Sequence, residues 1–102
     1  MGYKIVFDEV ILRQLKKAGK NKFIRDILSK FFDKIEELGP RAGQLIDSKL
    51  KIYEMKMKRP PIRLFFKHKL ETNEIYVFEY IMKTSHEKQQ SVIDKIRNKL
   101  GI

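Results

Sequence analysis

Residues 51–67, with the sequence KIYEMKMKRPPIRLFFK, decide the fold. Apolar and polar side chains alternate in residues 51–58 and again in residues 62–67, which is the pattern of two strands that each bury one face. Residues 59–61 contain two consecutive prolines, and proline cannot donate a hydrogen bond to a sheet. We therefore predict an antiparallel β-hairpin whose turn lies at residues 59–61.

The alternation determines which side chains share a face of this hairpin. The core face must carry the apolar set, because a shift by one residue would bury lysines instead. With the turn centred on Arg59 and Pro60, Lys56 lies directly opposite Arg63 on the other face. Like charges in this position destabilise a strand pair by up to about 1 kcal/mol, so the arrangement suits the binding of an anion. The apolar set is Tyr53, Met55, Met57, Ile62, Leu64 and Phe66.

Positive charge is concentrated around the same hairpin. Residues 51–70 contain seven Lys and Arg residues and one acid, Glu54, which is a net charge of +6 out of +10 for the whole chain. We expect a sheet face that gathers cations without acids to balance them, which suits an anionic partner. The alternative is a solvated strand face that uses lysine to prevent aggregation between sheet edges.

The N-terminal part of the chain predicts one strand and two helices. Residues 3–6 form a short extended stretch. Asp8 is interpreted as a helix cap, and the apolar residues after it recur every three or four positions until Gly19. A second apolar stripe follows Asn21, which we interpret as another cap. This helix ends at Gly39, because the proline that follows cannot continue it.

The remaining segments predict a loop, one more strand and a last helix. Residues 41–49 contain a single short apolar pair and are interpreted as a loop. A polar turn at residues 71–74 precedes residues 75–82, which are nearly all apolar and predict a central strand buried on both faces. Thr84 and Glu87 match the capping box that opens a helix, and an amphipathic pattern follows them.

The predicted order of elements is β-α-α-β-β-β-α in a single domain of residues 1–102. Helices followed by a run of hairpin-connected strands are typical of the α+β class with an antiparallel sheet. We expect the two N-terminal helices to pack on one face of this sheet, and a C-terminal helix to follow the last strand. Tight turns make the last three strands neighbours, so the first strand must pair at an edge.

The composition excludes several classes of protein. A hydrophobic content of 42% is too high for wholesale disorder, and the absence of cysteine excludes disulfide scaffolds, iron–sulfur clusters and thiolate zinc sites. No apolar run approaches the ~18 residues of a membrane span, and the start becomes acidic too early for a secretory signal. We therefore expect a cytoplasmic protein with no membrane partner. A net charge of +10 predicts polyanionic partners such as nucleic acid or an acidic protein.

A second group of polar residues lies at the predicted start of the last helix and includes Lys83, His86 and Lys88. Backbone N–H groups at a helix start favour a phosphate, and a histidine can exchange a proton near neutral pH. The alternative is a capped helix whose first turn contains a histidine. With two histidines and no cysteine in the chain, we expect no transition-metal site and no cofactor.

Three segments resemble the RelE/ParE superfamily of toxins from toxin–antitoxin modules, and most closely its ribosome-dependent mRNA interferases, including the HigB-like branch. Residues 3–9 resemble the first strand and helix of that family. Residues 53–66 resemble its hairpin, in which a tyrosine and alternating basic residues are followed by an arginine between hydrophobic residues. Residues 77–84 resemble its last strand, which runs into a basic segment.

The resemblance implies a RelE-like fold, a small sheet with the helices packed on one side, similar to microbial ribonucleases. It implies cleavage of mRNA in the ribosomal A site, in which a ribose 2′-hydroxyl attacks the adjacent phosphate without a metal ion, so that translation stops. It also implies a cognate acidic antitoxin as a partner, in a hetero-oligomer with the toxin, in addition to the ribosome and mRNA.

The resemblance also implies roles for individual residues, which act by positioning the substrate and by stabilising developing charge. Arg63 matches the arginine that holds the scissile phosphate, and Lys56 matches the lysine that activates the 2′-hydroxyl or stabilises charge. The basic residue at the end of the last strand falls on Lys83 or, in a shifted alignment, on His86. These four are the expected catalytic residues. The expected RNA-binding residues around them are Lys51, Lys58, Arg59, Lys67 and Lys88.

Two features depart from the family pattern. Position 54 is a glutamate where the best-studied branch has a second lysine, and the C-terminal tyrosine of that branch has no counterpart after Tyr80. His86 is our candidate for the missing proton donor. Three alternatives follow: a toxin that inhibits gyrase, as ParE-like members do, a basic module that binds RNA or DNA without cleaving it, and a degenerate, inactive toxin.

Overall fold

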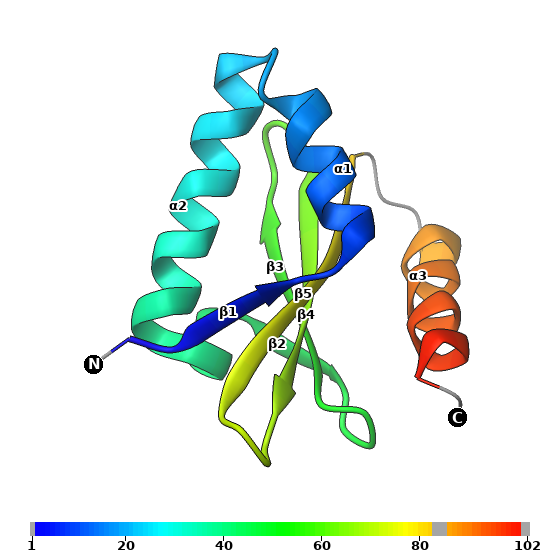
Figure 1. Ribbon diagram of the computed structural model, residues 1–102. Coiled ribbons are helices and arrows are strands. Elements are labelled where there is room, and N and C mark those ends of the chain that lie inside the picture. The colour runs from blue at the N-terminus through cyan, green and yellow to red at the C-terminus, as the bar shows by residue number, and fades with distance from the viewer. Residues whose placement is uncertain (1, 83–85, 101–102) are drawn as a thin grey trace.

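The computed structural model describes residues 2–82 and 86–100, and for residues 86–89 the backbone alone. Figure 1 shows a sheet that lies between a pair of helices and a third helix. Within the described residues, no helix has the length and apolar content that a bilayer span requires. The elements in chain order are β1 (Lys4–Phe7), α1 (Glu9–Ala18), α2 (Lys22–Leu38), the 3-10 helix η1 (Gly39–Ala42), β2 (Gln44–Asp47), β3 (Ile52–Met57), β4 (Ile62–Lys69), β5 (Glu74–Met82) and α3 (His86–Lys99).

The strands form one five-stranded sheet in the order β1-β5-β4-β3-β2. The α+β class is confirmed, β3, β4 and β5 are antiparallel neighbours, and β1 lies at an edge as predicted. The sheet is mixed rather than wholly antiparallel, because β1 pairs with β5 in parallel. Short turns force antiparallel pairing only between consecutive strands, and β1 joins the sheet beside a strand that is distant in sequence.

Residues 41–49, which were predicted to be a loop, contain the end of η1 and all of β2. Leu45 of β2 pairs with Tyr53 of β3, and the register shifts before Asp47 pairs with Ile52. A strand of four residues with an irregular register produces too few alternations to be recognised from its sequence.

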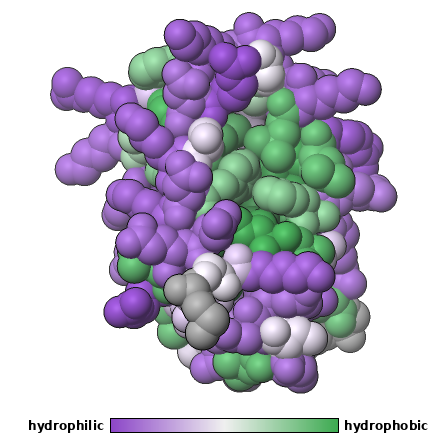
Figure 2. All heavy atoms as spheres, turned by 60° about the vertical axis from the view of Figure 1, so that its left-hand side comes forward, coloured by the Kyte–Doolittle hydropathy of each residue, from purple (hydrophilic) through white to green (hydrophobic). Residues whose placement is uncertain are grey.

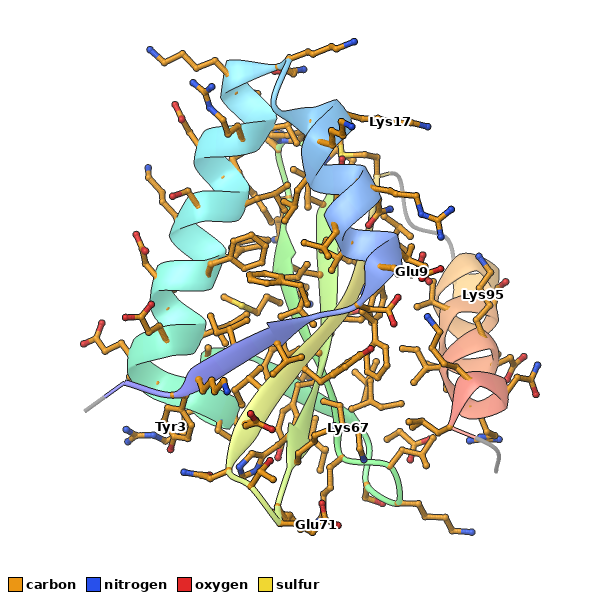
Figure 3. All side chains as sticks on the ribbon, viewed as in Figure 1. Tyr3, Glu9, Lys17, Lys67, Glu71 and Lys95 are labelled. Atoms are coloured by element: carbon orange, nitrogen blue, oxygen red, sulfur yellow. The ribbon has the colours of Figure 1, made fainter. Side chains whose placement is uncertain are left out.

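One face of the sheet carries α1 and α2. Both helices begin at the predicted caps, where the Asp8 side chain accepts from the Val10 amide and Asn21 accepts from two amides of the first turn of α2. Figure 3 shows the space between these helices and the sheet filled by side chains, and Figure 2 shows that the surface on the α2 side keeps a hydrophobic area bordered by hydrophilic side chains. The buried residues of this face include Ile11, Ile24, Leu28, Phe31, Ile35, Met55, Ile62, Leu64, Phe66 and Val77.

The opposite face of the sheet carries α3, whereas the resemblance implied helices on one side only. Phe65 and Phe78 are buried on this face against Val92 and Ile96 of α3. The hairpin strands therefore bury apolar side chains on both faces at the far end from their turn. The apolar stripe of α3 requires a surface to cover, and the face under α1 and α2 is already occupied.

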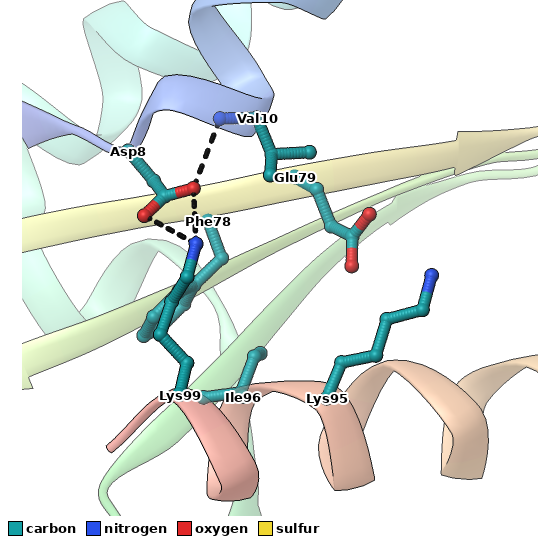
Figure 4. Close-up of a pocket in the computed structure, with 7 residues that line it drawn as sticks. All are labelled: Asp8, Val10, Phe78, Glu79, Lys95, Ile96 and Lys99. Atoms are coloured by element: carbon teal, nitrogen blue, oxygen red, sulfur yellow. Dashed lines mark hydrogen bonds and ion pairs between the residues drawn. The ribbon is translucent and has the colours of Figure 1, made fainter.

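The last turn of α3 is attached to the body by a buried acid. The Lys99 amino group lies 2.7 Å from both carboxylate oxygens of Asp8, as Figure 4 shows, and the Tyr76 hydroxyl donates to the same carboxylate at 2.7 Å. Burial and the Asp8 carboxylate raise the pKa of Tyr76 to about 12, so its hydroxyl remains a donor. A second ion pair, between Arg97 and Asp47 at 3.0 Å, joins α3 to β2.

We expect Asp8→Asn to destabilise the protein in a pH-dependent way. Burial raises the pKa of the Asp8 carboxyl, but hydrogen bonds from Lys99, the Val10 amide and Tyr76 outweigh it, so the pKa lies below its ordinary value of 3.8. A lowered pKa stabilises the folded state above the unfolded-state value, and this stabilisation is lost as the pH falls through the folded-state value. The substitution should lower the free energy of unfolding by about 1–3 kcal/mol near neutral pH.

Urea denaturation of both proteins between neutral pH and about pH 3 measures this effect, and the difference between them should shrink below about pH 4. Asp33→Asn is the matched control, because Asp33 is an exposed acid on α2. It should change the unfolding free energy little at any pH. A difference for Asp8→Asn that stays constant down to the acid limit would contradict the assigned role of the carboxylate.

Candidate active site

Lys56 and Arg63 lie directly opposite each other on β3 and β4, as the hairpin pattern predicted. The whole predicted register is observed, since Met55 pairs with Leu64 and Tyr53 with Phe66 on the core face. Lys56 is exposed, whereas the Arg63 side chain is 27% exposed. The hairpin therefore presents two cations from neighbouring strands on one face at its turn end.

An acid balances one of these cations, contrary to the prediction of a face without acids. The Arg63 Nη1 donates to both carboxylate oxygens of Glu54 at 2.9 Å, and the Glu54 side chain is 3% exposed. Glu54 is two residues before Lys56 and so shares its face of β3, where it lies diagonally across from Arg63. The face thus contains a buried carboxylate in contact with a guanidinium and an exposed ammonium group beside them.

The geometry leaves part of the guanidinium available. A guanidinium has five N–H donors in a rigid plane, and the Glu54 pair uses Nη1 alone. Among the described residues, Nε and Nη2 of Arg63 donate to no protein acceptor. The site can therefore bind a phosphate with donors whose orientation is already set.

The structure divides the other predicted RNA-binding residues of the hairpin between its two ends. Lys58 and Arg59 are exposed in the turn that follows Lys56. Lys67 is at the other end, where it faces Ile52, four residue pairs from the Lys56 pair or about 13 Å along the strands. Its amino group donates to the backbone carbonyl of Leu50, close to Lys51. Lys51 and Lys67 thus do not join the group around Arg63.

The predicted residues of the β5–α3 junction lie outside the described part of the chain. This holds for Lys83, and also for the side chains of His86 and Lys88. The last described residue of β5, Met82, pairs with Ile62, and Ile81 pairs with Arg63. The strand that leads to the junction therefore ends beside the candidate site.

The sequence pattern did not predict that Glu54 pairs with Arg63. The resemblance marked position 54 as a departure from a family pattern, although the same alternation that placed Lys56 opposite Arg63 also places Glu54 on their face. The signal was a single acid among seven cations in residues 51–70. Among the described residues, no group of three His, Asp or Glu side chains is arranged as metal ligands would be.

Solved structures resemble this fold, although no family model and no curated protein sequence matches the chain. The isolated RelE toxin of E. coli superimposes with a TM-score of 0.69 at 21% identity, over 92% of this chain and 98% of the toxin. A free E. coli RelE variant with two arginines replaced by alanine reaches 0.72 at 21% identity, over 94% and 99%. A chain of the intact E. coli RelBE toxin–antitoxin complex reaches 0.66 at 21% identity, over 81% and 99%. The chain has a RelE-like fold.

Proposed function

We propose that this protein is the toxin of a toxin–antitoxin pair and an endoribonuclease that cleaves mRNA on the ribosome. The observation that carries the proposal is the cross-strand pair of Lys56 and Arg63, on a sheet face of a RelE-like fold. Glu54 balances one of the two cations, and a phosphodiester bound between them would balance the positive charge that remains.

The proposed reaction is an internal transfer at one phosphodiester. The ribose 2′-hydroxyl loses its proton to solvent as its oxygen attacks the adjacent phosphorus. The bond from phosphorus to the 5′-oxygen breaks, the 5′-oxygen takes up a proton, and the products are a 2′,3′-cyclic phosphate and a 5′-hydroxyl. Arg63 binds the phosphate oxygens through Nε and Nη2, and Lys56 stabilises the charge that develops as the 2′-oxygen attacks. The leaving 5′-oxygen needs a proton, for which His86 is the candidate donor.

Two partners follow from this proposal. The ribosome holds the message in position in the cytoplasm, and the net charge of +10 favours contact with RNA. The second partner is an acidic antitoxin that wraps the body and covers or displaces parts of the active face. A RelE chain bound to an antitoxin peptide is among the similar structures, with a TM-score of 0.62 at 20% identity, over 91% of this chain and 95% of that one. The cation pair disfavours a toxin that acts on gyrase without cleaving RNA.

Primer extension on mRNA after induction of the protein tests the proposal. We expect cuts in phase with codons in the wild type and about 10- to 100-fold fewer cuts with Lys56→Ala, because one ammonium is removed from the developing charge. Lys34→Ala, which removes an exposed lysine from α2, is the matched control and should cut like the wild type. Intact message together with DNA damage would instead identify a gyrase inhibitor.

A further inference from the structure

The connection between α1 and α2 carries a second concentration of positive charge, outside the hairpin of β3 and β4. Residues 10–25 contain six Lys and Arg residues and no acid. Arg13 is paired with Glu9 at 2.9 Å. Among the side chains that the structure describes, none of the other five forms an ion pair. We call these five and Phe23 the α1–α2 tip: Lys16, Lys17, Lys20, Lys22, Phe23 and Arg25, all of them exposed.

Helix stability accounts for only two of these five cations. Lys16 and Lys17 lie in the last turn of α1, where positive charge interacts favourably with the helix dipole. Lys22 and Arg25 lie at the start of α2, whose first turn contains no acid, and there positive charge opposes the dipole. A sequence that served only the helix would place acids at this end.

Phe23 also has no role in the core. Its side chain is 61% exposed, and the buried stripe of α2 begins with the next residue, Ile24. The aromatic ring is therefore largely in solvent, on a residue that follows Lys22 in the chain. Exposed aromatic rings among cations are the combination with which proteins bind RNA, since the ring stacks on an unpaired base and the cations contact phosphates.

The α1–α2 tip lies at the same end of the molecule as the candidate site. Figure 1 shows the α1–α2 connection and the β3–β4 turn at one end, and Figure 3 shows Lys17 pointing outward there. The two surfaces are on different sides of the sheet, because α1 and α2 pack against the face opposite α3. Because both surfaces border the same end of the molecule, an RNA that wraps around this end can contact both.

We propose that the α1–α2 tip binds a structured RNA outside the cleavage site, with its cations on the phosphates of a stem and Phe23 stacked on an unpaired base. The proposal shares with the proposed function only the idea that the partner is RNA. It assigns to the protein two RNA contacts, one that cleaves and one that holds. Charge complementarity favours this occupant, since unbalanced lysines and arginines need a regular array of anions.

The test measures binding of a 2′-O-methylated RNA stem-loop, which cannot be cleaved, by the full-length protein over a series of salt concentrations. The tip variant carries Lys17→Gln, Lys20→Gln and Lys22→Gln. The matched control carries Lys30→Gln, Lys34→Gln and Lys49→Gln, which removes the same charge from other exposed positions. We expect the tip variant to bind roughly 10-fold more weakly. The slope of its log binding constant against log salt concentration should fall by the amount that corresponds to about two phosphate contacts. The control should change binding less than about twofold.

Equal weakening by both variants, or no weakening by the tip variant, would overturn the inference. The inference would also be overturned if the tip variant lost binding to phosphatidylglycerol vesicles but kept binding to RNA, because a lipid surface would then be the partner. Phe23→Ser should weaken binding to the stem-loop more than binding to a blunt duplex. A wild type that binds the stem-loop but cleaves no message overturns the proposed function alone, so the two failures are distinguishable.

Discussion

Arg63→Ala is expected to lower the rate of mRNA cleavage about 100- to 1000-fold and to restore growth to cells that express the protein. The guanidinium is the group whose free donors face the proposed phosphate, and its orientation is set by Glu54 at 2.9 Å. A lysine at position 63 would retain the charge but not the planar fork, so Arg63→Lys should recover only part of the rate. Single-turnover cleavage on programmed ribosomes measures both variants.

Loss of folding must be separated from loss of chemistry in this experiment. Arg63→Ala removes the guanidinium from a carboxylate that is 3% exposed, and this lowers stability. The double variant Arg63→Ala with Glu54→Gln removes the buried charge as well and should fold more stably than the single variant. It should remain inactive. Rapid cleavage by either folded variant would show that Arg63 is not the phosphate-binding residue.

Glu54→Gln is expected to lower kcat about 10- to 100-fold while KM falls. The carboxylate holds Arg63 through one nitrogen, so the amide would leave the guanidinium less constrained in the transition state. The substitution also raises the net charge of the site by one, which strengthens binding of the RNA ground state. A positioning role therefore predicts opposite effects on the rate and on the affinity.

Glu37→Gln is the matched control for this variant, since Glu37 is an exposed acid of α2, which packs against the face of the sheet opposite α3. It should leave kcat and KM unchanged. Glu54→Asp keeps the carboxylate and should recover part of the rate. If kcat is unaffected in folded Glu54→Gln, the ion pair only stabilises the hairpin.

The hairpin of β3 and β4 could be predicted from sequence because two physical constraints agreed on it. The alternation of apolar residues left one register that buries no lysine, and the consecutive prolines located the turn. The opposition of Lys56 and Arg63 followed directly and is confirmed. The stripes and caps of α1 and α2 were predictable for the same reason, since each helix buries one side against a single sheet face.

Other features depend on contacts between distant segments, which periodicity does not record. The parallel pairing of β1 with β5 and the edge strand β2 are of this kind. So is the side of the sheet on which α3 packs, which depends on Phe65 and Phe78 having a second apolar face to share. The pairing of Glu54 with Arg63 is a diagonal contact between neighbouring strands, and it is one of several contacts that the side chains of this face could make. Alternation identifies the face but not the partner.

The structure of the protein on a ribosome, with a message 2′-O-methylated at the cut nucleotide, tests the central claim most directly. We expect Nε and Nη2 of Arg63 to lie within about 3 Å of the scissile phosphate oxygens, with the Lys56 amino group beside the blocked 2′-oxygen. A complex in which the message contacts another face, and the hairpin of β3 and β4 points away from it, would contradict the account.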